Sequence, residues 1–267
     1  MATKMRRFHR RRGLEGLAAL AAAGVLTAGP DLAAEAAGRA PLTWSRIGRL
    51  PDFTTGIWEV PMTPAAFAPG AQPVQTPAYA ARAKAYAAAQ AAGGEQDSPG
   101  ANCLPSGMPT IMSQPYPMQI LFGPREVTID IEAFMQVRHI YTDGRPHPAD
   151  PDLTFNGHST GRWEGGTLVV DTVGFTPDTP LGFDWGMRHS TKMHILERFR
   201  LTDPDTLQIA TTIEDPEALA GPWTTTRSFR RHTDWTIAEY VCEQNNRNLV
   251  DANGKAGIVL DPPKPSQ

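Results

Sequence analysis

The sequence predicts a mainly β protein whose strands close into an antiparallel up-and-down barrel of lipocalin type, with an N-terminal helix and wrapping segments. A β-sandwich is the alternative. Three observations lead to this fold class: apolar and polar residues alternate in most segments after residue 117, turn signals such as Gly165-Gly166 separate the segments, and no helical pattern lies between them. Short connections favour antiparallel neighbours, and closure removes exposed strand edges.

Residues 1–36 have the pattern of a cleaved export signal. Arginines cluster between positions 6 and 12, an Ala-rich apolar stretch follows, and Ala34-Glu35-Ala36 has the small residues that a signal peptidase accepts. The apolar stretch is too short and too Ala-rich for a stable membrane span. We therefore expect a periplasmic or secreted mature chain with no membrane span. Twin-arginine export and the ordinary secretory route both remain open.

Residues 37–117 are rich in Pro, Ala and Gly, and we expect them to wrap around a larger body. One helix is predicted in this segment, in the stretch "TPAYAARAKAYAAAQAAGG". Thr76 would be its N-cap, Pro77 its first helical residue and Gly93-Gly94 its end.

The barrel domain is expected over residues 118–250, with a frayed tail at 251–267. "EVTIDIEA" and "TLQIATTI" show the period of two most clearly. The candidate strands lie near 118–122, 125–132, 135–142, 157–164, 167–175, 192–201, 206–214, 222–231 and 235–242.

Composition limits the function classes. The chain has 267 residues and a formal net charge of -3, which suits one sizeable domain or two small ones and gives no electrostatic reason to expect nucleic acid as a partner. A small molecule is the default partner. In an oxidising compartment Cys103 and Cys242 can form a disulfide, while two buried free thiols are the alternative.

Four predicted strands each place one charged residue on an apolar face. Because an unpaired buried ion costs several kcal/mol, these groups must pair with one another or face a wet cavity. One reading is an internal salt bridge of Arg227 with Glu197 or Asp171. The other is a ligand cavity with polar anchors and tryptophan walls, Trp163 among them. The four charges are Asp171, Glu197, Arg227 and Glu239.

Two polar loops are expected at one mouth of the barrel, where loops on a rigid scaffold commonly carry function. Imidazole titrates near working pH, and an adjacent carboxylate can fix its tautomer. The candidate acid-base residues are Asp143, His147, His158 and His189. The candidate substrate-binding residues are Tyr141, Arg145, Trp163, Asp171, Trp185, Glu197, Arg227 and Glu239. His194 is expected to point to solvent, and His139 and His232 to be structural or surface residues.

Signals for a metal site or a hydrolase nucleophile are weak. The sequence has no HExxH, and "GHSTG" around Ser159, although it fits GxSxG, lacks the strand-turn-helix elbow that exposes a nucleophile. No glycine loop that cradles phosphate leads into a helix. We therefore expect no metal and no cofactor. A zinc site made from His147, His158 and His189 is the alternative.

Several long segments resemble a group of exported bacterial proteins. The resemblance covers roughly residues 100 to 248 and is carried by "CLPSGMPTIM", "QVRHIYTDGRPHP", "GHSTGRWEGGTLVVDTVGF", "HSTKMHILERFR", "DPEALAGPWTTTRSFRR" and "EYVCEQNNR". It implies an exported setting and no particular reaction. His139 departs from the group's pattern, which weakens it as a site residue.

These observations predict an enzyme that acts on a small organic molecule by acid-base chemistry, as a lyase, isomerase or hydrolase. A non-catalytic carrier or sensor of an apolar small molecule is the alternative. A structural partner in an envelope complex is a third possibility, suggested by the N-terminal wrap.

Overall fold

The computed structural model describes residues 41–63, 72–92, 103–177, 179–182, 186–242, 249–250 and 256–257. The expected export signal, Trp185 and most of the tail lie outside the described residues.

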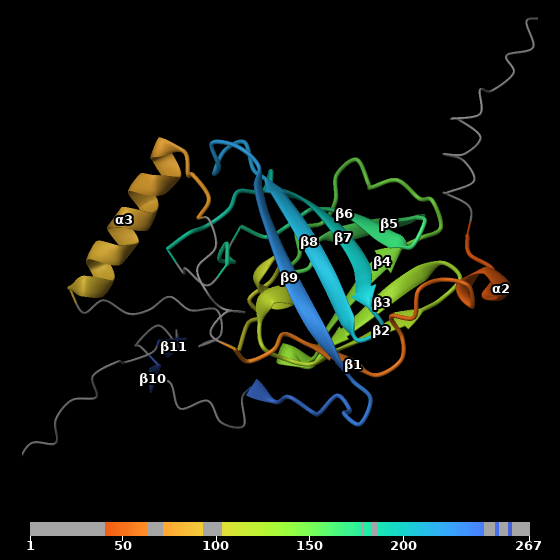
Figure 1. The fold of residues 1–267 in the computed structure, drawn as a ribbon. Helices are drawn as coiled ribbons and strands as arrows, with labels where there is room; N and C mark the ends of the chain where they lie inside the picture. The colour runs from red at the N-terminus through yellow and green to blue at the C-terminus, as the bar shows by residue number, and fades with distance from the viewer. Residues whose placement is uncertain are drawn as a thin grey trace, which may run out of the picture.

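Nine strands form a closed barrel in which each strand neighbours the next along the chain (Figure 1). The mainly β barrel is therefore confirmed, and the β-sandwich is not formed. The strands are β1 (Ile57–Glu59), β2 (Met118–Phe122), β3 (Glu126–Ile131), β4 (Gln136–Tyr141), β5 (His158–Glu164), β6 (Thr167–Val173), β7 (His194–Asp203), β8 (Thr206–Glu214) and β9 (Trp223–His232).

One strand pair departs from the expected antiparallel meander. β4 and β5 run parallel and pair only at Ile140 with Ser159 and at Tyr141 with Thr160, whereas the other neighbouring pairs are antiparallel. Residues 142–157 are long enough to carry the chain back along the barrel, which a parallel pair requires. The barrel is therefore mixed. The connection between β4 and β5 carries His147, one of the candidate acid-base residues.

The barrel closes through a strand that the sequence did not predict. β1 pairs with β9 on one side and with β2 on the other. Three residues are too few to show an alternation. Because β1 occupies the free edge of β9, the strand expected at 235–242 does not form. That segment instead contacts the barrel through Ala238, whose N–H donates to Glu132, and through Tyr240, whose ring lies 5.1 Å from Phe134.

The predicted helix is present as α3 (Pro77–Ala91), with Thr76 at the N-cap and Pro77 at its first position. Thr76 ties the helix start to the barrel, because its hydroxyl donates to the carbonyl of Glu217. The body of α3 extends away from the barrel (Figure 1). The remaining elements are α2 (Trp44–Ile47), η3 (Thr110–Ser113), η4 (Ala133–Met135), β10 (Leu249–Val250) and β11 (Ala256–Gly257).

Inward-facing side chains fill the barrel. Ile129, Ile140, Val170, Ile195 and Phe199 are buried at 0% exposure. An aromatic cluster lies beside them, in which the Trp163 ring is 5.6 Å from Phe53 and 5.4 Å from Phe122. Trp163, expected as the wall of a ligand cavity, therefore packs with other aromatic rings.

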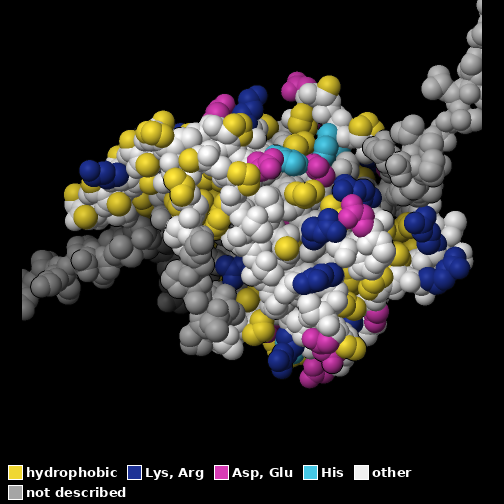
Figure 2. All heavy atoms as spheres, turned by 45° about the horizontal axis from the view of Figure 1, so that its top comes forward, with side chains coloured by type: hydrophobic (Ala, Val, Ile, Leu, Met, Phe, Trp, Pro, Cys, Tyr) yellow, Lys and Arg dark blue, Asp and Glu magenta, His cyan; other side chains and the backbone are white. Residues whose placement is uncertain are grey.

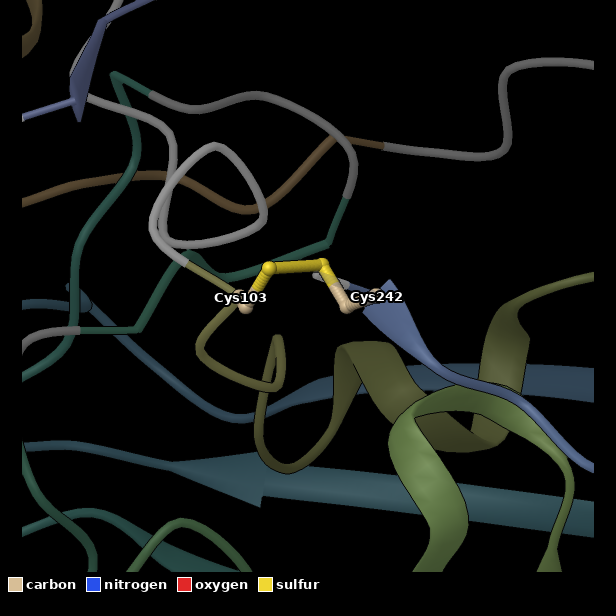
Figure 3. The surroundings of a disulfide bond; sticks show 2 residues. All are labelled: Cys103 and Cys242. Atoms are coloured by element: carbon tan, nitrogen blue, oxygen red, sulfur yellow. A yellow bond between two sulfur atoms is a disulfide. The ribbon is translucent and has the colours of Figure 1, made fainter. Parts of the chain in front are cut away.

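The two cysteines form a disulfide, as predicted (Figure 3). Cys103 precedes the barrel strands β2 to β9, and Cys242 follows them at a sequence separation of 139. A cross-link over a loop of this size stabilises the fold by about 5 kcal/mol in the chain-entropy model. The alternative of two free thiols is wrong. Among the described residues, no helix is long and apolar enough to cross a membrane.

Candidate functional site

A buried ion pair lies in the barrel interior, between Arg138 of β4 and Glu197 of β7. Their side chains are 1% and 0% exposed, and the Arg138 Nη1 to Glu197 Oε1 distance is 3.1 Å. Arg138 also donates to the hydroxyls of Ser159 and Thr172. The expected internal salt bridge of Glu197 therefore exists, but its partner is Arg138 and not Arg227. The pair links four consecutive strands.

The other three charged residues expected inside the barrel lie in three different environments. Arg227 shares the inner face of β9 with the buried Phe229, and burial lowers its pKa. Glu239 is exposed and lies outside any strand. Asp171 lies on the outer face of β6, because Val170 and Thr172 occupy the inner face. The four charges do not share a hollow, so the expected cavity inside the barrel is not supported.

The outward position of Asp171 places it in a group of histidines that we call the histidine chain: His158, His147, Asp171 and His194. The Nδ1 atoms of His158 and His147 are 2.8 Å apart, and His147 Nε2 lies 3.0 Å from Asp171 Oδ1. The same oxygen lies 3.0 Å from His194 Nε2. Two predicted site histidines and one predicted carboxylate thus come together on the outside of the barrel.

Strand register explains this assembly. His158 and His194 are the first residues of β5 and β7, on either side of β6, and Asp171 pairs with Thr160 and Leu196. Gly157 brings the chain close to β6 just before His158. At φ 67°, a Cβ there would lie 2.7 Å from a Phe175 ring carbon. His147 reaches the group from the connection between β4 and β5.

The hydrogen-bond partners assign the protons of His147 and His158. A carboxylate only accepts, so His147 Nε2 carries a proton that it donates to Asp171. In a neutral ring, His147 Nδ1 is then an acceptor, and His158 Nδ1 must supply the proton between the two rings. His158 Nε2 is consequently left with a free lone pair, the form that a general base requires.

Burial and charge favour the neutral form of His158. Burial is the largest cause that lowers its pKa, followed by the nearby His147 and Arg145. The hydrogen bond from His194 is the largest cause that holds the pKa of Asp171 below its ordinary value. Both shifts favour an anionic Asp171 beside a neutral His158 near neutral pH.

Asp143 holds arginines in place beside the histidine chain. Its side chain is 3% exposed and accepts from Arg145 Nη2 at 2.6 Å and from Arg125 Nη2 at 2.9 Å. The hydrogen bonds from Arg145 are the largest cause that lowers the pKa of Asp143 far below its usual range. A carboxylate held in this way does not exchange protons near neutral pH. Its contribution is to fix Arg145, whose guanidinium lies 4.0 Å from the centre of the Tyr141 ring.

His189 does not join the other predicted histidines. It is 1% exposed, with Nε2 2.7 Å from the Thr179 hydroxyl and Nδ1 2.9 Å from the carbonyl of Ser190. The alternative zinc set of His147, His158 and His189 is therefore not assembled. Within the described parts of the chain, no group of three or more His, Cys, Asp or Glu side chains is arranged to hold a metal ion.

His158 also lines a pocket of about 430 Å³ on the outer side of β4, beneath the connection to β5. Its walls are mixed, with apolar side chains such as Val137 and Phe155 beside polar ones such as His139, Asp152 and Asn156. We call it the outer pocket. Figure 2 shows a surface on which histidine side chains lie beside acidic side chains and close to arginines. The outer pocket is the place where a small molecule could meet His158.

Two residues of this arrangement were missed by sequence reasoning. His194 was assigned to solvent because its neighbours on the same face are charged, although the outward face also carries Asp171. Arg138 lies between Val137 and His139 in the run "QVRHIY". Its alternation with Ile140, which is buried, was the available signal.

No protein-family model, curated protein or solved structure matches this chain in the three comparisons made.

Proposed function

We propose that this protein is an exported enzyme that moves a proton on a small organic molecule bound in the outer pocket. The observation that carries the proposal is the continuous run of hydrogen bonds from Asp171 through His147 to His158, which ends at the pocket. Lyase, isomerase and hydrolase reactions all need such a step, and a positioned base typically contributes about 10²–10⁴ in rate.

The proton positions suggest how the step occurs. His158 Nε2 takes a proton from a C–H or O–H bond, and the electron pair of that bond stays on the substrate. The proton on His158 Nδ1 passes to His147 Nδ1. His147 is then a cation that donates to Asp171 Oδ1, 3.0 Å away, so the new positive charge lies beside a fixed negative one. Reversal of these transfers returns the proton to the product.

The pocket walls favour a small and mainly uncharged substrate. Val137, Phe155, Pro148 and Pro151 offer apolar contacts. Arg145, held over Tyr141 beside the pocket, can stabilise negative charge that develops when the proton leaves.

An exported setting is part of the proposal. The disulfide supports an oxidising compartment, in which such bonds persist. Cleavage after Ala36 and delivery to the periplasm or the medium would follow from the basic and apolar N-terminal pattern. N-terminal sequencing of the protein from the medium or periplasm tests this, and an intact N-terminus would contradict it.

The base can be tested without the natural substrate. Nitrobenzisoxazole is a small aromatic probe in which removal of one carbon-bound proton breaks an N–O bond and releases a coloured phenolate. We expect His158→Gln to lower the rate of this reaction by at least about 100-fold.

The matched control is His232→Gln. His232 is another partly buried histidine, with Nε2 3.4 Å from Glu59 Oε2, and it lies outside the histidine chain and the pocket. This variant should keep the wild-type rate. Equal rates for wild type and His158→Gln would show that the acid-base assignment is wrong.

A carrier of apolar small molecules remains the second candidate. The observation in its favour is that apolar side chains at the pocket are unusually exposed: Val137 is 44% exposed, and the nearby loop residue Leu153 is 50% exposed. A carrier would retain its ligand during purification, and native mass spectrometry would detect the added mass. Recovery of the bare chain alone would argue against this role.

A further inference from the structure

We propose that His194 is a positioning residue that adjusts the strength of the base at the outer pocket, because it shares Asp171 Oδ1 with His147. This inference rests on the proposed acid-base function and extends it to control by a residue outside the pocket. It assigns a role to a histidine that neither binds the substrate nor contacts His158.

The geometry at Asp171 is the first argument. His147 Nε2 and His194 Nε2 each lie 3.0 Å from the same oxygen. One carboxylate charge therefore serves two imidazoles. A positive charge on one ring is stabilised by Asp171, and it makes a second positive charge on the other ring less favourable.

The second argument is the proton requirement of His194. Its Nε2 faces Asp171 Oδ1, and its Nδ1 faces Glu214 Oε2 at 3.4 Å. Carboxylate oxygens only accept, so both contacts are satisfied together only when His194 carries protons on both nitrogens. His147 differs, since its Nδ1 can accept from His158, and one proton on its Nε2 serves both Asp171 and the Thr160 hydroxyl. Of the two rings that share Asp171, His194 is therefore the one that carries the positive charge before any substrate reacts.

The charged groups that face His194 agree with this assignment. Asp171 faces it from β6 and Glu214 from β8. His147, in the connection between β4 and β5, reaches the same Asp171 oxygen. The hydrogen bond with Asp171 is the largest cause that raises the pKa of His194, and Glu214 adds to it.

The consequence is a base whose strength depends on His194. While His194 is a cation, its charge opposes the arrival of a second positive charge on His147. When His194 loses its proton, Asp171 supports His147 alone, and a proton on the His158–His147 pair becomes more stable. The base at the pocket therefore becomes stronger as His194 is deprotonated.

Nuclear magnetic resonance can measure this coupling directly. The full chain is labelled with ¹⁵N-histidine, and the His158 ring signals are followed against pH in wild type, His194→Gln and His194→Lys. Gln keeps an N–H donor for Asp171 but has no charge, whereas Lys keeps a permanent positive charge. Lys192→Gln removes an exposed cation two residues away and serves as the control.

We expect His194→Gln to raise the proton affinity of His158 on the order of tenfold, in keeping with the loss of one nearby charge. His194→Lys should leave the affinity at or below the wild-type value, and Lys192→Gln should leave it unchanged. The proposal is overturned if His194→Gln has no effect. It is also overturned if the Gln and Lys variants shift His158 in the same direction by similar amounts, or if Lys192→Gln shifts it as much as His194→Gln.

This measurement requires no substrate, so it separates the two proposals. A coupling between His194 and His158 in a protein that does not open nitrobenzisoxazole would support this inference and contradict the proposed function. Turnover that depends on His158, without a coupling between His194 and His158, would support the proposed function and contradict this inference.

Discussion

The inside and the outside of the same barrel wall use charged residues in different ways. Inside, Arg138 and Glu197 are almost completely buried and bind each other together with two hydroxyls. Outside, His147 is 23% exposed and Asp171 is 32% exposed, and each is hydrogen-bonded to further histidines of the chain. Water reaches the outer group, so its protons can exchange with solvent, whereas the inner pair is shielded from water. The inner pair therefore contributes to folding, and the outer group is the place for proton chemistry.

The largest expected effect is loss of stability when the inner pair is broken. Arg138→Met leaves Glu197 buried without a partner, which should lower the free energy of unfolding by about 3–5 kcal/mol. Urea denaturation measures this change. The double variant Arg138→Met/Glu197→Leu removes both charges and should recover most of the loss. A double variant as unstable as the single one would show that shape, and not charge, makes this pair important.

The second largest expected effect is the loss of stability when the disulfide is removed. This change should leave the histidine chain on the outer side of the barrel unaffected. Replacing Cys103 and Cys242 with Ser should cost about 2–5 kcal/mol, because the cross-link restricts the unfolded chain. Urea denaturation of the Ser variant, and of the wild type with and without reductant, gives the value. The His158 titration should stay as in wild type, since neither cysteine contacts the histidine chain. A changed titration would mean that the outer group depends on the covalent link.

Asp171→Asn, in the outer group, should differ from Arg138→Met in the inner pair. We expect a large loss of activity and a small loss of stability. The amide keeps the shape of the carboxylate but cannot stabilise a cation on His147. We expect nitrobenzisoxazole turnover to fall by about 10- to 100-fold. The free energy of unfolding should change by less than about 1 kcal/mol, as for other partly exposed ion pairs. Unchanged turnover would contradict the proposed proton transfer from His158 to His147 beside Asp171.

Much of the fold follows from sequence alone because alternation is a strong signal. Strand β3 has the regular pattern of buried Val127, Ile129 and Ile131 between half-buried polar residues, and it was predicted to within one residue at each end. β1 could not be found in this way, because three residues show no period and its pairing with β9 is decided by barrel closure.

The orientation of Asp171 could not be predicted because β6 is apolar on both faces. Val169 faces outward yet is fully buried, and its neighbours across the strands are Arg162 and Arg198. The aliphatic parts of such long side chains can cover an outward valine. Alternation then no longer tells the inside from the outside. The histidine chain also needs the β4–β5 connection to bring in His147. The length of that connection did not show whether β4 and β5 run parallel or antiparallel.

The smallest predicted effect tests the outer group through stability and not through activity. Asp171 and Glu214 raise the pKa of His194 above 6.5, so the folded state holds this proton more tightly than the unfolded chain does. The extra stability of wild type over His194→Gln should be complete below that value and should disappear as the pH rises through the folded-state pKa. Since His194 is 34% exposed, solvent screening limits the difference to less than about 1 kcal/mol. Urea midpoints of both proteins in mildly acidic and in alkaline buffer measure it. A difference that grew with pH would mean that His194 is buried as a neutral ring, and the comparison between the two sides of the wall would then fail at this residue.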